Sequence, residues 1–204
     1  MDTIAVISRS ISGRKDLEGL IIELSKKYHV KVYNNSQKSF FEQNTIEERS
    51  TPKLSNLRVK IITLLYMCFG VLPENKENYF VLKLFEINNR SPWSQFFKSK
   101  LIKIRQYLPS FIKYDTYLSM LEKHTNIKLN DIDKVLIVTE AGSSELIAAA
   151  LKNNIPSYVY VYSWDHPFKH TSFSKRYEKY FVWGESVKKE LIDLNLIPES
   201  KIQV

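Results

Sequence analysis

Residues 135–139 have the sequence VLIVT, residues 158–162 have the sequence YVYVY, and the chain between them has the apolar spacing of a helix. Both runs are rich in β-branched or aromatic residues and are bounded by polar ones, which predicts two buried strands. Residues 142–144 (GSS) are suited to turn the chain and cap the helix, and residues 153–156 (NNIP) are suited to end it. Because strand, helix and strand follow one another with tight connections, we expect a βαβ unit with two parallel strands.

A second unit of this kind is predicted at the N-terminus, with strands at 3–7 and 30–33 on either side of a helix. Another short strand is predicted at 180–183, and residues 197–204 begin a further one. Strands as continuously apolar as these need cover on both faces of their sheet. The expected fold is therefore a three-layer α/β/α Rossmann-like domain with a mostly parallel sheet.

The chain between the two units is predicted to be mainly helical. Residues 34–56 are polar, which indicates a loop, whereas residues from about 57 to 125 indicate a helical insertion. Its first helix, at 57–72, is expected to be buried, because its longest apolar run holds twelve residues and a membrane span needs about 20. The chain has one cysteine and no basic leader before the first strand, so we expect neither an internal disulfide nor a signal peptide. These features predict a cytoplasmic protein.

Two chemically rich loops follow the strands of the 134–183 unit, and ligands bind beyond the carboxyl ends of parallel strands. The second loop places an aromatic ring, a carboxylate and an imidazole side by side in the sequence SWDHP (163–167). The candidate acid–base groups are Asp165 and His166, with Glu140 in the first loop as the alternative base. The candidate binding residues of the two loops are Gly142, Ser143, Ser144, Trp164, Lys169 and His170. In the alternative interpretation, Trp164 fills the core and Asp165 caps a helix.

A third candidate loop follows the first strand and contains Ser12, Gly13 and Arg14. Small and basic residues at a helix N-terminus can cradle a phosphate. The sequence has no Gly-rich dinucleotide fingerprint and no Walker motif, and the alternative is a helix cap with solvated charges.

The net charge of +8 is concentrated in the first part of the chain. Residues 1–130 hold 21 Lys/Arg against 12 Asp/Glu, whereas residues 131–204 hold 9 against 10. A predicted helix at 93–108 alternates apolar and basic residues without an acid, which is typical of a helix that lies on an anionic membrane surface. Its membrane-facing residues would be Lys98, Lys100, Lys103 and Arg105. An ordinary helix with a solvated basic face would have the same pattern. Nucleic-acid binding is the weaker alternative, because no nucleic-acid module is recognisable.

The C-terminal part of the chain resembles a recurrent pattern of GT-B glycosyltransferases. The pattern consists of YFVWGE (180–185), KKEL (188–191) and IPESKIQV (197–204), and VYSWDHP (161–167) resembles a loop on the interdomain cleft of such proteins. The similarity is greatest to the surface-polysaccharide and CDP-glycerol glycerophosphotransferase-like branch. Its detailed part covers about residues 134–204, and residues 1–33 match only as a generic βαβ unit.

The resemblance implies that residues 1–204 form the N-terminal, acceptor-side domain of such a transferase, with no C-terminal donor domain. The chain would then be a fragment, the product of a truncated reading frame or one subunit of a split enzyme. The implied partners are a nucleotide-sugar donor, held by a second domain, and a glycan or lipid-linked acceptor at the inner face of the cell membrane. A scaffold that recruits a catalytic partner to the membrane is the alternative. We expect no metal and no cofactor, because the sequence has neither a Cys/His cluster for zinc nor the paired carboxylates of metal-dependent transferases.

Overall fold

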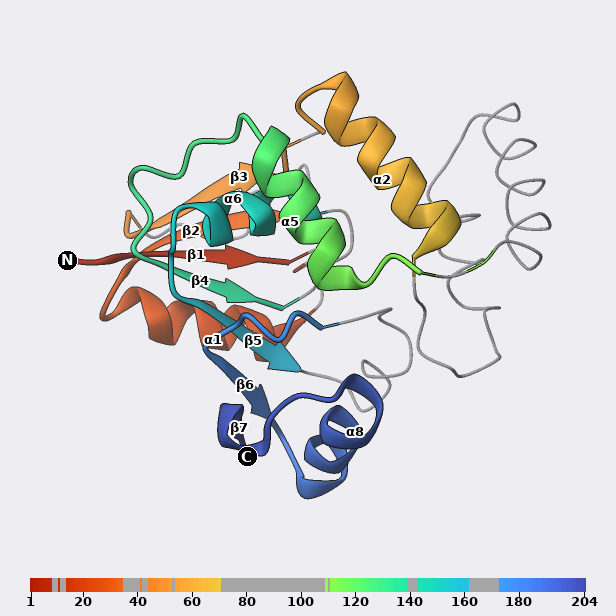
Figure 1. Ribbon diagram of the computed structural model, residues 1–204. Coiled ribbons are helices and arrows are strands. Elements are labelled where there is room, and N and C mark those ends of the chain that lie inside the picture. The colour runs from red at the N-terminus through yellow and green to blue at the C-terminus, as the bar shows by residue number, and fades with distance from the viewer. Residues whose placement is uncertain are drawn as a thin grey trace, which may run out of the picture.

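The computed structural model describes residues 1–8, 11, 14–34, 41, 44–52, 54–70, 109, 111–138, 143–161 and 173–204. Seven strands form one sheet: β1 (Thr3–Ile7), β2 (His29–Asn34), β3 (Ile46–Ser50), β4 (Lys134–Ile137), β5 (Ser157–Val161), β6 (Lys179–Val182) and β7 (Ile202–Gln203). Their order is β3-β2-β1-β4-β5-β6-β7, and every neighbouring pair is parallel (Figure 1). This is the strand order of doubly wound nucleotide-binding sheets, extended by one strand. The predicted Rossmann-like α/β fold is confirmed.

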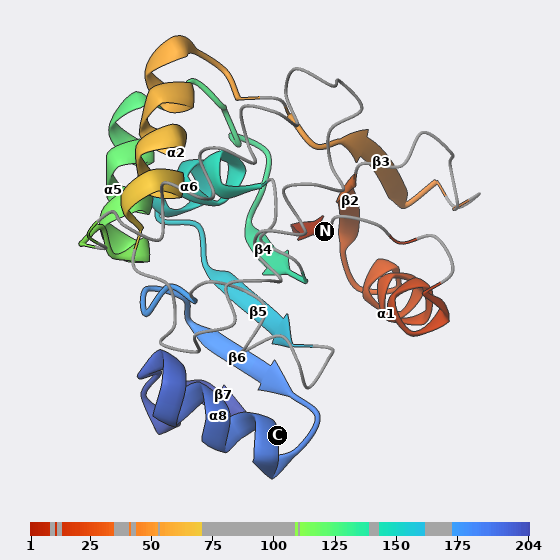
Figure 2. The same cartoon turned by 90° about the vertical axis from the view of Figure 1, so that its right-hand side faces the viewer.

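Helices cover the two faces of the sheet unequally. Of the helices in the described part of the chain, α1 (Lys15–Ser25) lies on one face. The other face carries α2 (Leu57–Phe69), α5 (Tyr114–His124), α6 (Ser144–Lys152) and α8 (Glu185–Asn195). Figure 2 shows α1 on one side of the strands and the other helices on the opposite side. This division follows from the topology, because the chain moves in opposite directions from β1 to β2 and from β4 to β5, and both crossovers are expected to be right-handed.

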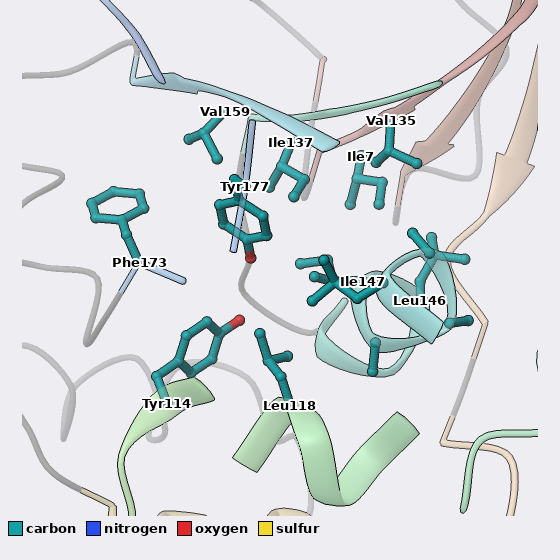
Figure 3. Packing of buried hydrophobic residues seen from close by; sticks show 14 of the residues in the cluster. Ile7, Tyr114, Leu118, Val135, Ile137, Leu146, Ile147, Val159, Phe173 and Tyr177 are labelled. Atoms are coloured by element: carbon teal, nitrogen blue, oxygen red, sulfur yellow. The ribbon is translucent and has the colours of Figure 1, made fainter. Parts of the chain in front are cut away.

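Two separate apolar clusters result from the alternation of side chains along each strand. In β5, Val159 and Val161 belong to the large cluster under α5, α6 and α8, whereas Tyr158 and Tyr160 pack on the smaller cluster under α1. Figure 3 shows Leu118 of α5 and Ile147 of α6 pointing toward the strand residues of the large cluster. Each fully buried side chain of this kind contributes about 1.5–3 kcal/mol from its removal from water.

The predicted strands at 3–7, 30–33 and 180–183 correspond to β1, β2 and β6 with boundaries that agree to within one residue. The strand predicted at 135–139 is β4, which ends at Ile137, and the strand predicted at 158–162 is β5, which ends at Val161. Residues 139 and 162 lie outside the described part of the chain.

The loop predicted for residues 34–56 is wrong for its second half, because Ile46–Ser50 forms β3. This strand lies at the edge of the sheet, so it has few apolar residues and only Ile46 is buried. Its charges are paired instead: the Glu47 carboxylate binds the Arg49 guanidinium at 2.8 Å and lies 4.0 Å from the buried ammonium of Lys31. Charged side chains on an edge strand also discourage pairing with another chain.

The prediction of a buried helix at 57–72 is also only partly correct. The helix exists as α2, which begins after the Asn56 cap and ends at Phe69, and Val59 and Ile62 are buried. Its other side, however, exposes four large apolar residues to solvent. Residues 71–108, including the predicted helix at 93–108, lie outside the described part. Among the helices that the structure describes, none has the length and apolar character needed to cross a membrane.

Candidate functional site

The centre of the sheet's carboxyl edge is the point where the chain changes direction between β1 and β4. The amide of Val138 donates to the carbonyl of Ile7 at 2.8 Å, and the amide of Ser8 donates to the carbonyl of Tyr33 at 3.0 Å. From these adjacent ends, the chain continues to α1 on one face and to α6 on the other. Such a switch point leaves a crevice between the diverging connections, and it is where open α/β sheets bind ligands.

The two loops with the predicted acid–base groups leave neighbouring strands at this same edge. Strands β4 and β5 are parallel and in register, with Val135 opposite Ser157 and Ile137 opposite Val159. The predicted parallel pairing is therefore confirmed, and it requires residues 139–142 and 162–172 to start from the same edge. The side chains themselves lie outside the described residues, namely Glu140, Gly142, Trp164, Asp165, His166, Lys169 and His170.

The chain is firmly anchored on both sides of residues 162–172. Before them, Val161 is fully buried at the end of β5; after them, Phe173 and Ser174 are buried as well. The Tyr180 hydroxyl donates to the carbonyl of Ser174, and the amide of Arg176 donates to the Ser174 hydroxyl at 3.2 Å. Figure 3 shows Phe173 at the margin of the large cluster, and its ring meets that of Tyr180 edge-on at 5.7 Å. These contacts hold in place the described residues on either side of the segment that carries the Trp-Asp-His sequence.

The start of α6 presents Ser143 and Ser144 at the switch point. Ser143 is in the capping position and only 2% exposed, and its carbonyl accepts the amide of Ile147 at 3.0 Å. Its hydroxyl makes no capping hydrogen bond, so the expectation that the side chain caps the helix is wrong. Ser144 is the first helical residue and is half-buried. Both residues therefore stand at the start of α6, at the carboxyl edge of the sheet.

Glu145 is the residue that sequence reasoning missed. It is 3% exposed, and its carboxylate accepts hydrogen bonds from the Ser55 amide at 2.8 Å, from the Ser55 hydroxyl and from the Thr125 hydroxyl at 3.1 Å. It thereby ties the first turn of α6 to the segment before α2 and to the end of α5. The only signal in the sequence is an acid in a first helical turn, and such an acid usually interacts with the helix dipole in solvent.

The start of α1 has a pair of opposite charges. The Arg14 guanidinium donates to the two oxygens of the Asp16 carboxylate at 3.0 and 2.6 Å. This hydrogen-bonded ion pair lowers the pKa of Asp16 below its usual value. Arg14 therefore lies at the helix start, as predicted, but a carboxylate already binds its guanidinium. Ser12 and Gly13 lie outside the described residues.

Among the described residues around the switch point, acidic side chains offset the positive N-terminal ends of α1 and α6. A helix N-terminus attracts anions, but the first turn of α1 already has Asp16 and Glu18, and that of α6 has Glu145. The described part of this edge also includes Ser143 and Ser144 at the start of α6. Within the described ranges, no group of three or more His, Cys, Asp or Glu is placed to hold a metal ion.

The remaining predicted residues form a separate set, Lys98, Lys100, Lys103 and Arg105, and these lie outside the described part of the chain. No family model matches the chain, and no curated protein matches its sequence. The fold alone therefore defines the class of the protein: a doubly wound, all-parallel α/β domain whose switch point lies between β1 and β4.

Proposed function

We propose that this chain is the acceptor-side domain of a GT-B-type glycosyltransferase, or of a related glycerophosphotransferase-like enzyme, of cell-surface polysaccharide synthesis. The proposal starts from the sequence resemblance of residues 134–204. It is supported by the doubly wound strand order, which is the order that such a domain requires. The donor would be bound by a second domain, which lies either in the same polypeptide or in a partner subunit.

The observation that carries the acceptor assignment is the compensated charge at the switch point. A donor site must stabilise a nucleoside diphosphate, and uncompensated helix N-termini and basic side chains do this best. Here Asp16 and Glu145 already occupy the first turns of α1 and α6, and Asp16 also binds Arg14. A glycan hydroxyl needs only hydrogen-bonding partners, such as the Ser143 hydroxyl, which makes no capping hydrogen bond.

The chemistry of the transfer then assigns roles to the residues of the two loops. The acceptor oxygen attacks the anomeric carbon, or the phosphorus in a glycerophosphotransferase, while the bond to the departing nucleotide breaks. A base must take the proton of the acceptor hydroxyl as the new bond forms. We assign this role to Asp165 with His166 as its orienting partner, and Glu140 is the alternative base. Trp164 would pack against the sugar ring, and the Gly142-Ser143-Ser144 turn would bind its hydroxyls.

Hydrogen exchange of the chain alone, followed by mass spectrometry, tests whether it holds acceptor or donor. The acceptor probe is a lipid-linked disaccharide in detergent micelles, and the donor probes are CDP-glycerol and UDP-N-acetylglucosamine. The acceptor probe is expected to slow exchange at residues 143–147 and 161–174, whereas the nucleotides leave both regions unchanged.

A matched pair of serine variants sharpens the assay. Ser143→Ala removes a hydroxyl that makes no capping hydrogen bond at the start of α6. It is expected to weaken binding of the acceptor probe about tenfold. Ser186→Ala removes an exposed hydroxyl from the first turn of α8 and should leave binding unchanged. Protection by the nucleotides at α6, with none from the disaccharide, would overturn the acceptor assignment.

A further inference from the structure

The outer side of α2 is an apolar stripe that nothing in the described part of the molecule covers. Leu57 is 71% exposed, Ile61 48%, Leu64 46% and Leu65 39%. A single exposed leucine is ordinary on a protein surface, but four on consecutive turns of one helix form a continuous patch. In Figure 1, α5 lies between α2 and the sheet.

The stripe has a basic residue along each of its edges. At about 100° of rotation per residue, the four apolar positions and Cys68 fall within an arc of about 100°. Arg58 and Lys60, both exposed, lie on the two sides of this arc, and Val59 and Tyr66 point the opposite way toward α5. An apolar arc flanked by long cationic side chains is the arrangement of helices that lie in a membrane interface, because the stems cover lipid tails and the charges reach the headgroups.

The surroundings of the stripe have the same character. At the end of α2, the ring of Phe111 lies 5.4 Å from that of Phe69 and is 64% exposed, next to the exposed Lys113. No acidic residue occurs between Arg49 and Glu74. The apolar surface therefore extends beyond the helix. Because α2 contains no acidic residue, no carboxylate of this helix offsets the charges of Arg58 and Lys60.

We propose that α2 is a membrane-contact helix, and that the stripe Leu57, Ile61, Leu64 and Leu65 rests in the interface of an anionic lipid bilayer. Charge favours a lipid bilayer, rather than residues 71–108 of the same chain, as the partner of the stripe. That segment holds seven Lys/Arg against three Asp/Glu, so it has the same sign as the border of the stripe and would be drawn to the same anionic surface. A second copy of α2 would likewise bring Arg58 and Lys60 against identical charges. The inference does not depend on the transferase proposal.

Sedimentation of the full chain with vesicles tests the proposal. The vesicles contain either equal parts of phosphatidylglycerol and phosphatidylcholine or phosphatidylcholine alone. The chain is expected to bind the anionic vesicles, more weakly as salt is added, and to leave the neutral ones in large part unbound. Cys68 is the chain's one cysteine and falls within the same arc of α2 as the stripe, so an environment-sensitive fluorophore on it should shift to the blue on binding.

Two double variants address the apolar stripe and its basic border separately. Ile61→Ser with Leu64→Ser should weaken binding to the anionic vesicles by at least about tenfold. Arg58→Gln with Lys60→Gln should weaken it about 25-fold, since each basic residue near an anionic surface contributes about fivefold. All four positions are exposed, so thermal melting should stay close to that of the natural chain.

Matched controls make the same chemical changes elsewhere. Ile22→Ser alters an exposed isoleucine of α1, and Lys27→Gln with Lys189→Gln removes two exposed charges far from α2. Both controls should bind within about twofold of the natural chain. The double lysine variant should lose only the long-range attraction between its two removed charges and the vesicle. Equal binding to neutral vesicles, no binding to anionic ones, or undiminished binding by both α2 variants would overturn the proposal. Concentration-dependent dimerisation that Ile61→Ser abolishes, without vesicle binding, would assign the stripe to a second copy instead.

Discussion

Helices α6 and α2 are both apolar around most of their circumference, yet the fold treats them in opposite ways. In α6, every residue from Glu145 to Leu151 is buried, because the sheet lies on one side of the helix and α5 on the other. In α2, Val59 and Ile62 face α5, whereas the stripe faces solvent. An apolar helix needs cover on each apolar side, but its sequence does not say what supplies that cover.

The largest expected effect comes from the same substitution made in the two helices. Ile147→Ala in α6 removes a side chain with no exposed surface from the centre of the core and should lower the free energy of unfolding by about 3 kcal/mol. Ile61→Ala in α2 removes a half-exposed side chain and should cost less than about 1 kcal/mol. Urea denaturation followed by circular dichroism measures both. Equal losses would mean that the stripe is packed against other parts of the chain and would break the comparison.

The next effect concerns the start of α6. Glu145→Ala leaves the Ser55 and Thr125 donors without their buried acceptor and should cost about 2–3 kcal/mol. Glu145→Gln keeps one acceptor oxygen and should cost less. Hydrogen exchange should locate the loss at the first turn of α6 and at residues 55–59. If Glu145→Ala were neutral, the carboxylate would have no part in positioning this edge of the sheet.

Much of the fold was predictable because the strands and the β4–α6–β5 unit depend on local patterns. The apolar runs and the Asn-Asn-Ile-Pro end signal (153–156) lie within a few residues of the elements that they specify. The end of α6 is an example, where Asn154 takes the left-handed conformation (φ 53°) that asparagine tolerates. Strand β3 was missed because an edge strand with one buried residue has too little apolar pattern to detect.

The candidate site was less predictable, because its partners are distant in the sequence. Glu145 binds Ser55, which lies ninety positions earlier, and no local pattern indicates such a contact. The exposed stripe of α2 was misjudged for a related reason: its apolar run is too short to span a membrane, which indicates a core helix, but no local pattern shows which neighbour covers each side. The parallel pairing of β4 and β5 was predicted correctly, since the βαβ pattern determines it, whereas the adjacency of the side chains after these strands stays a prediction.

The smallest expected effect is at the start of α1. There the Arg14–Asp16 ion pair is exposed, whereas Glu145 at the start of α6 is buried. The Arg14 ion pair lowers the pKa of Asp16, so its contribution to stability is complete above the ordinary carboxyl pKa and is lost as pH falls through the lowered one. Arg14→Gln should raise the pKa of Asp16 toward 3.8 and leave stability at neutral pH within about 0.5 kcal/mol. Titration of the Asp16 carboxyl by NMR checks this, and an unchanged pKa would show that the pair does not form in solution.

The most direct test of the proposed function is the transfer reaction itself. The chain is joined to, or expressed with, a nucleotide-binding second domain, and acceptor-dependent release of nucleotide is measured. Asp165→Asn and His166→Ala are each expected to lower turnover by about 10²-fold, as loss of an acid–base group does. Asp193→Asn, on the exposed side of α8, is the matched control and should leave turnover unchanged. Near-normal turnover in both loop variants would contradict the assignment of the Trp-Asp-His loop to catalysis.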